Sequence, residues 1–267
     1  MSRLFAGLVL MGVLALAGVL GGCASGSPGS DQAQAGAAGE GDPWEPFNRT
    51  MYKVNTELDR YTLRPAAEAY SRVVPDPVRT GIHNILTNLA YPVQLANDML
   101  EGKPRRAGDT LVRFVVNSTV GVLGAVDVAQ HLGYPDHSSD FGLTLALWGV
   151  SGSPYLFLPV LGPGNPRDSF GRIVDIAGDP FGYIGQGTGV VVARWTRLGV
   201  NLIDQRAQYL GVFSQIRRTA LDPYATFRSL YRQHRSAEIE SVRADHARTV
   251  PAWFPVSAEP SDHSSSN

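Results

Sequence analysis

The chain has 267 residues, a formal net charge of -1 and a sequence pI of about 6.6. This balance of charges argues against a nucleic-acid-binding protein, because such proteins carry a strongly basic surface. The single cysteine, Cys23, excludes an intramolecular disulfide bond, even in an oxidising compartment.

The chain begins with a pattern typical of bacterial export signals. Arg3 precedes an uncharged apolar run over residues 4–19, which is slightly shorter than the roughly 20 residues that span a bilayer. Residues 20–23 (LGGC) then match a lipobox and resemble a lipoprotein signal. We therefore expect residues 1–22 to be a signal peptide and Cys23 to be the site of lipid attachment, rather than a buried or catalytic thiol. Ala24 follows Cys23, where Asp would favour the inner membrane in such lipoproteins, and this points to the outer membrane.

Two further segments lack the composition of a packed domain. Residues 23–41 consist mainly of small residues after the acylated Cys23, and we expect them to form a flexible tether. The end of the chain, PVSAEPSDHSSSN (255–267), is polar, and we expect it to be disordered. The remaining chain is long enough for one domain with its own core.

The periodicity of this domain is helical. Apolar residues recur at helical spacing over residues 47–61, 78–89, 195–210 and 224–231. Asp-Pro pairs at 42–43, 76–77 and 222–223 indicate helix starts, because Asp can cap exposed amides and Pro is tolerated at the first helical position. We find no run of alternating strand residues and no repeat of fixed period. The sequence therefore predicts an all-α fold in a single helical domain.

The middle of the domain is poor in charge. Residues 141–166 contain no charged side chain, but Pro154, Pro159, Pro163 and several glycines would break a membrane-spanning helix. Two interpretations remain open: apolar segments that lie within one leaflet, or a buried core. Five aromatic residues are expected either at a membrane interface or in a packed core. They are Trp148, Tyr155, Phe157, Tyr183 and Trp195.

We find no motif that predicts an enzyme, a metal site or a cofactor. Residues 149–153 (GVSGS) resemble a nucleophile elbow around Ser151, but Ser153 stands where the second glycine belongs, and the strand-turn-helix context is missing. The histidines are scattered without metal-ligand spacing. A membrane-bound lipase that uses Ser151 remains an alternative hypothesis.

Several long motifs occur in a fixed order. They are DPWEPFNRTMYKVN (42–55), RPAAEAY (64–70), VPDPVRTGIHNILTNLAYPVQLANDMLEGKP (74–104), RFVVNSTVGVLGAVDVA (113–129), FGLTLALWGV (141–150), PYLFLPVLGP (154–163) and ARWTRLGVNLIDQRAQYL (193–210). In this order they resemble the MlaA (VacJ) family of outer-membrane lipoproteins. The resemblance assigns residues 42–235 to the helical domain and leaves residues 236–267 as a helical extension and polar tail.

This resemblance implies a fold and a function. Family members form a flat ring of amphipathic helices around a channel in the inner leaflet of the outer membrane, lipid-anchored on the periplasmic side. They associate with trimeric porins, withdraw misplaced phospholipids from the outer leaflet and pass them to a soluble periplasmic carrier of the MlaC type. They thereby maintain lipid asymmetry without catalytic residues. A polar channel lowers the free energy needed to move a charged headgroup through hydrocarbon. A structural lipoprotein that only associates with porins is the main alternative.

Polar residues beside the apolar helix faces are candidates for the channel lining. They are Asn48, Arg49, Asn55, Asn84, Asn88, Arg194 and Arg206. Arginine suits a phosphate because its planar guanidinium donates two parallel hydrogen bonds; the alternative role for each residue is helix capping or a solvated surface. Gly121 and Gly124 are hinge candidates, with close helix packing as the alternative. The arginine-rich residues 217–248 either contact anionic headgroups or the carrier, or form a solvated helix face.

Lipid attachment at Cys23 is directly testable. We expect Cys23→Ser to remain unprocessed by the lipoprotein peptidase and to lack the acyl anchor, because the thiol that accepts the lipid is absent. Mass spectrometry of the purified protein measures both properties. A normally cleaved, triacylated Cys23→Ser product would contradict the assignment.

Overall fold

The computed structural model describes residues 42–183, 185 and 187–244. The predicted signal peptide (1–22), the attachment site Cys23, the tether and the polar tail lie outside the described residues. The helices and strands are α2 (Glu45–Tyr61), α3 (Leu63–Val73), α4 (Asp76–Leu100), α5 (Pro104–Thr119), α6 (Val128–His131), α7 (Phe141–Leu147), β1 (Leu156–Leu158), β2 (Gly162–Gly164), α8 (Pro166–Gly178), the 3-10 helix η1 (Pro180–Gly182), α9 (Thr188–Gln208), α10 (Leu210–Thr219) and α11 (Pro223–Arg243).

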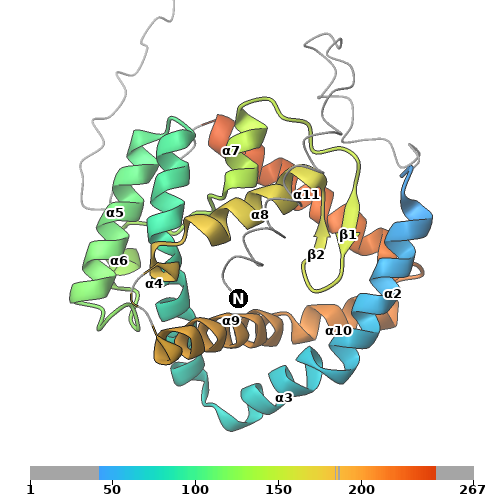
Figure 1. The fold of residues 1–267 in the computed structure, drawn as a ribbon, viewed down its shortest axis with the longest axis horizontal. Helices are drawn as coiled ribbons and strands as arrows, with labels where there is room; N and C mark the ends of the chain where they lie inside the picture. Colours follow the sequence, from blue (N-terminus) through green and yellow to red (C-terminus); the bar gives the residue numbers. More distant parts are fainter. Residues whose placement is uncertain (1–41, 184, 186, 245–267) are drawn as a thin grey trace, which may run out of the picture. The chain divides into compact units, whose positions relative to one another are not determined.

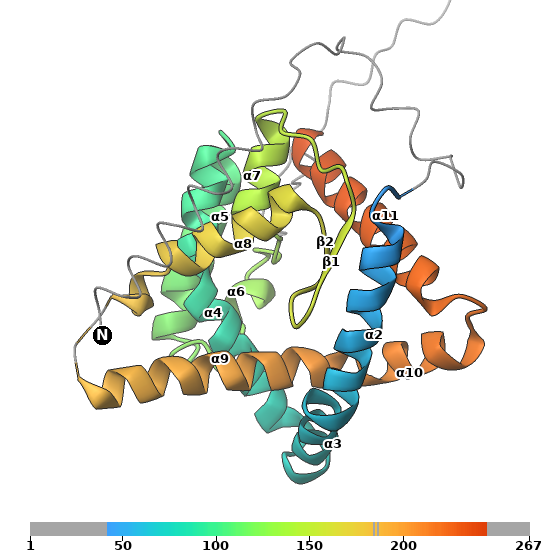
Figure 2. The ribbon, with the colours of Figure 1, turned by 45° about the vertical axis from the view of Figure 1, so that its right-hand side comes forward.

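Helices make up most of the described residues, and this confirms the predicted all-α class. In Figure 1 the helices follow one another around an interior, with the β1–β2 hairpin lying inside their course. Figure 2 shows the same arrangement from a second direction, with α2 and α11 beside the hairpin. Contacts of α4 with α5, α7 with α8, and α3 with α9 connect neighbouring helices. Among the described helices, none combines the length and apolar composition needed to cross a bilayer.

The three Asp-Pro pairs stand at helix starts, but only one caps as predicted. Asp222 is the N-cap of α11, and its carboxylate accepts a hydrogen bond from the backbone amide three residues ahead. Asp76 lies inside the first turn of α4, whose N-cap is Pro75. Asp42 precedes α2, whose N-cap is Trp44, and is buried in contacts with other helices. The capping prediction is therefore confirmed for α11 and wrong for α2 and α4.

The hairpin was not predicted, because its sequence lacks the alternation of a strand. Phe157 of β1 pairs antiparallel with Pro163 of β2. Gly162 has a φ of +77°, a left-handed conformation that favours glycine in a tight turn. The charge-free segment thus contains a short hairpin in addition to the helix α7.

The aromatic residues divide between the two predicted roles. Tyr155 and Phe157 are buried, and with Tyr224 they form the apolar core between the hairpin, α2 and α11. The other three are more than half exposed: Trp148, Tyr183 and Trp195. The charge-poor middle therefore contributes both to the core and to the surface.

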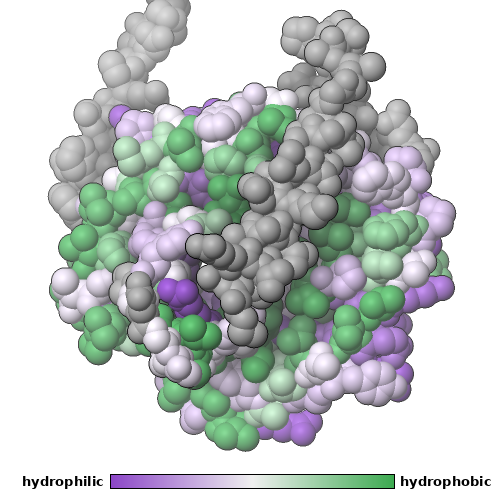
Figure 3. All heavy atoms as spheres, in the orientation of Figure 1, coloured by the Kyte–Doolittle hydropathy of each residue, from purple (hydrophilic) through white to green (hydrophobic). Residues whose placement is uncertain are grey.

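Many large apolar side chains lie on the surface of the described residues. The apolar face predicted for α2 is exposed, with Phe47, Val54, Leu58 and Tyr61 between 42% and 71% accessible. Similar exposed residues follow one face of α8 and α9: Phe170, Ile173, Ile176, Val191, Val192, Trp195 and Leu198. Figure 3 shows hydrophobic side chains spread over the visible face. More polar and charged residues than hydrophobic residues are buried, which is the reverse of a water-soluble domain.

Arg206 of α9 and Asp59 of α2 form a buried ion pair between the two helices. The guanidinium donates to both carboxylate oxygens of Asp59, at 2.5 and 2.8 Å, and lies over the ring of Phe213. We expect Arg206→Ala to lower the free energy of unfolding by about 3 kcal/mol, because it leaves Asp59 buried beside only one further guanidinium. Thermal denaturation measures this loss.

The matched control is Arg60→Ala, which removes an exposed guanidinium that lies 3.8 Å from Glu57. An exposed pair of this kind contributes at most about 1 kcal/mol. Equal melting temperatures for Arg206→Ala and Arg60→Ala would contradict the stabilising role of the buried pair.

Glu101, the C-cap residue of α4, has a largely buried carboxyl group. Its Oε1 accepts a hydrogen bond from the Ser139 hydroxyl at 2.9 Å, whereas Oε2 is buried without a partner among the described residues. Burial raises the pKa of Glu101 to about 7, and the Ser139 hydroxyl offsets part of this change. The folded protein therefore holds a proton at Glu101 that the unfolded chain releases.

The raised pKa of Glu101 predicts a pH dependence of stability. The unfolded chain loses this proton near pH 4.5, so the free energy of unfolding falls as the pH rises from about 4.5 to about 7. As the pH rises over this range, we expect the melting temperature of Glu101→Gln to fall less than that of wild type. Thermal denaturation across the range checks this, with Glu240→Gln on the exposed face of α11 as the control that keeps the wild-type profile. Identical profiles for Glu101→Gln and wild type would rule out the effect.

Candidate functional site

Two of the predicted lining residues hold the hairpin against α2. Asn48 has no exposed surface; its amide donates to the Tyr155 carbonyl at 2.9 Å and accepts from the Phe157 amide at 2.8 Å. Asn55 accepts a hydrogen bond from the Val160 amide at 2.8 Å, at the turn of the hairpin. The side chain of Asn48 is thus fully used in holding the hairpin, and its role in lining a channel stays a prediction.

Two of the arginines predicted to line a channel form ion pairs with carboxylates. Arg49 pairs with Asp222 at 2.6 Å and with Glu45 at 2.7 Å, which connects α2 to the start of α11. Arg206 is buried in its pair with Asp59. A guanidinium already neutralised in this way has little affinity left for a phosphate, so both residues serve to join helices.

Asn84 of α4 contacts the loop that follows α5, and Asn88 contacts the last turn of α5. Asn84 donates to the Ala125 carbonyl at 3.1 Å, and the buried Asn88 donates to the Ser118 hydroxyl at 2.8 Å. A Cβ atom added to Gly124, whose φ is +94°, would lie 2.6 Å from the Asn88 Cβ. A Cβ atom on Gly121 would lie 2.2 Å from the Val126 carbonyl oxygen. Both glycines are thus required for close packing, and their role as hinges stays a prediction.

Arg194 of α9 is the most accessible of the predicted lining residues. It lines a shallow pocket of about 410 Å³ with Tyr183, Val190 and Val191. We find no ion pair between Arg194 and any described carboxylate. Its guanidinium is therefore free to contact an anion, beside apolar side chains that suit an acyl chain.

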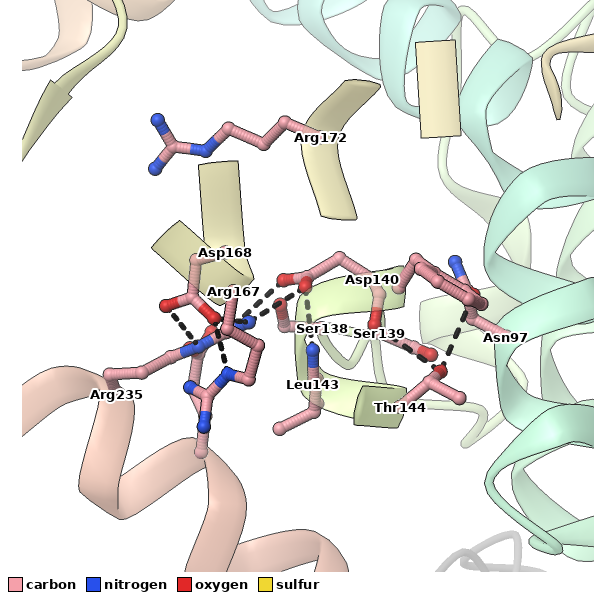
Figure 4. Close-up of polar contacts among 12 residues, drawn as sticks. Asn97, Ser138, Ser139, Asp140, Leu143, Thr144, Arg167, Asp168, Arg172 and Arg235 are labelled. Atoms are coloured by element: carbon pink, nitrogen blue, oxygen red, sulfur yellow. Dashed lines mark hydrogen bonds and ion pairs between the residues drawn. The ribbon is translucent and has the colours of Figure 1, made fainter. Parts of the chain in front are cut away.

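The polar interior contains a cluster of charges that the sequence did not predict. Arg235 of α11 donates to both carboxylate oxygens of Asp140, at 2.7 and 2.8 Å, and to Asp168 at 3.1 Å (Figure 4). Asp140 also caps α7, and Asp168 lies in the first turn of α8. One guanidinium thus holds three helices together.

The electrostatics of this cluster favour its charged form. Burial alone would raise the pKa of Asp168, but Arg235, the Tyr231 hydroxyl and Arg167 together lower the pKa below its ordinary value. The same carboxylates raise the pKa of Arg235 and outweigh the opposing effect of burial. The charges therefore stabilise one another at all physiological pH values. The sequence contains a local signal for part of this cluster, because Asp140 and Asn165 cap the helices α7 and α8. It contains no signal for Arg235 of α11, which is distant along the chain.

The described residues do not form a recognisable catalytic or metal-binding arrangement. Ser151 is exposed, and its hydroxyl oxygen accepts a hydrogen bond from the Ser153 amide at 3.2 Å. We find no group of three potential metal ligands among the described residues.

Comparisons with known proteins agree with this arrangement. The family model of the MlaA lipoprotein matches residues 40–238. The intermembrane phospholipid transport system lipoprotein MlaA of Haemophilus influenzae is 37% identical over 198 residues, which cover 72% of this chain and 77% of the relative. The protein of the same name from Escherichia coli is 36% identical over 219 residues, covering 80% and 82%.

A solved structure supports the same relationship. It is described as the structural basis for maintenance of bacterial outer membrane lipid asymmetry, and it is 34% identical to this chain. The alignment covers 75% of this chain and all of the solved chain, with a TM-score of 0.64. The chain therefore belongs to the MlaA lipoprotein family.

Proposed function

We propose that this protein removes phospholipids from the outer leaflet of the outer membrane and passes them to a soluble periplasmic carrier of the MlaC type. The lipid moves through an amphipathic passage bordered by the helices. The observation that carries this proposal is the distribution of side chains in the described residues. Apolar side chains cover much of the surface, whereas ion pairs and polar side chains occupy the interior.

The physical barrier to this transport is the charged headgroup of the lipid. Moving such a group through hydrocarbon without partners is costly. Polar groups along the passage, with Arg194 as an accessible cation, lower that cost. The exposed apolar faces of α2, α8 and α9 contact acyl chains and keep the protein in the membrane. No bond is broken, so the proposed function needs no catalytic residue.

The proposed location and partners follow from this route. The protein is anchored through Cys23 in the inner leaflet of the outer membrane, on the periplasmic side. Trimeric porins are the proposed partners, because they give a protein in the inner leaflet access to the outer leaflet. The exposed arginines of the α10–α11 region, Arg218, Arg232 and Arg243, support a contact with anionic headgroups or with an acidic carrier surface.

Deletion of the gene tests the transport function. We expect phospholipid to accumulate in the outer leaflet, with increased sensitivity to detergent and chelator, because misplaced lipid is no longer withdrawn. Labelling of intact cells with a membrane-impermeant amine reagent measures the outer-leaflet phospholipid, and the wild-type gene restores the normal level. A deletion strain with normal outer-leaflet composition would instead favour a structural role beside porins.

The matched variant Ser151→Ala distinguishes transport from lipid hydrolysis. We expect it to restore the deletion strain fully, because Ser151 has no role in a passive passage. Fatty acid released by the purified wild-type protein but not by Ser151→Ala would overturn the transport hypothesis in favour of the lipase.

A further inference from the structure

Arg172 of α8 lacks a carboxylate partner in the described part of the chain. Its guanidinium donates to two carbonyl oxygens of the hairpin turn, Leu161 at 2.7 Å and Pro163 at 3.5 Å. A guanidinium has five N–H donors, so most of its donors remain available. The bonds to the turn fix the position of the side chain and leave its positive charge without a counter-charge among the residues that the structure describes.

The two carboxylates best placed to neutralise Arg172 are engaged elsewhere. Residues three and four positions apart on a helix are neighbours, so Asp168 and Asp175 have the spacing for an ion pair with Arg172. Asp168 instead binds Arg235, and Asp175 accepts hydrogen bonds from Asn97 at 2.8 Å and from a backbone amide at 3.0 Å. Figure 4 shows Arg172 apart from the cluster that contains Asp168 and Asp140.

The hairpin turn that Arg172 contacts carries an apolar side chain. Leu161, whose carbonyl accepts a hydrogen bond from Arg172, has an exposed side chain. Phe170 and Ile173 are also exposed but lie on another face of α8, because residues one or two positions apart on a helix do not face each other. Arg172 itself is partly buried. A cation in such a setting binds an anion more strongly than a cation in open water, because fewer water molecules screen it. The apolar side chain of Leu161 adds contacts for a hydrocarbon chain attached to that anion.

We propose that Arg172 binds the phosphate of a phospholipid, while Leu161 contacts its acyl chains. This inference rests on the proposed function, because it identifies a residue that binds the transported lipid. The phosphodiester oxygens accept parallel hydrogen bonds from the guanidinium, a geometry that lysine cannot reproduce. Arg172 therefore recognises the phosphate, which all phospholipids share, and is indifferent to the remainder of the headgroup.

The test measures binding of a water-soluble phospholipid to the full-length protein in detergent. The probe is dihexanoyl-phosphatidylglycerol, followed by isothermal titration calorimetry. Dihexanoylglycerol, which lacks the phosphate, and inorganic phosphate alone are the comparison ligands. The variants are Arg172→Gln, Arg172→Lys and Arg105→Gln; the last makes the same charge change at an exposed residue of α5 that forms no ion pair among the described residues.

We expect Arg172→Gln to raise the Kd for dihexanoyl-phosphatidylglycerol about tenfold, the effect of losing about 1.4 kcal/mol from a charge-assisted hydrogen bond. Arg172→Lys should show a smaller increase, and Arg105→Gln should bind as wild type does. The Kd for dihexanoylglycerol should be the same in all variants. The melting temperature of each variant shows whether it folds. If Arg172→Gln does not fold, the comparison of Arg172→Lys with wild type serves as the test.

Three outcomes would overturn the assignment. In the first, folded Arg172→Gln binds the phospholipid as wild type does. In the second, it loses affinity for dihexanoylglycerol equally, which would mean that Arg172 acts only by holding the hairpin. In the third, wild type binds inorganic phosphate as tightly as the phospholipid, which would indicate a site for free phosphate. Each of these leaves the outer-leaflet phenotype of the deletion strain unchanged, so the proposed function is judged separately.

Discussion

Ion pairs buried between helices are the interaction on which the described structure depends. Arg235 joins α7, α8 and α11, and Arg206 joins α9 to α2. A buried charge costs several kcal/mol unless its partner is in place. Each pair therefore penalises any arrangement of the helices in which the two partners separate. The apolar core around Tyr155 and Phe157 is small by comparison, and it fixes mainly the hairpin.

Because polar groups occupy much of the interior, many apolar side chains lie on the surface. The exposed side chains of α2, α8 and α9 include Phe47, Ile173 and Trp195. Apolar area left in water loses roughly 25 cal/mol for each Å² that could have been buried. Acyl chains remove this penalty, so the same arrangement that is unfavourable for a protein in water is favourable at a membrane. The interior ion pairs and the apolar surface therefore both suit an amphipathic environment.

The sequence predicted the helices better than their orientation. Periodicity identified the helix that contains Phe47 and Leu58, yet it could not tell that this apolar face is exposed, because the pattern is the same for a core and for a lipid surface. The cap at Asp222 is local, and it was predicted correctly. Asn48 was expected to line a channel, but its partner Tyr155 lies 107 residues away, and no local signal reveals such a contact. Arg235 was missed for the same reason.

The contrast between Arg172 and the paired arginines has a consequence for transport. A passage lined by many unpaired cations would hold an anionic headgroup tightly and slow its release. Neutralisation of Arg49, Arg206 and Arg235 by carboxylates removes these competing sites. The guanidinium of Arg172, which backbone carbonyls hold in place, gains about tenfold in affinity from one charge-assisted hydrogen bond, enough to direct a phosphate without trapping it. An arginine that stabilises the fold needs a carboxylate partner, whereas an arginine that binds the lipid must lack one. The positions of the carboxylates therefore determine which of the two roles each arginine has.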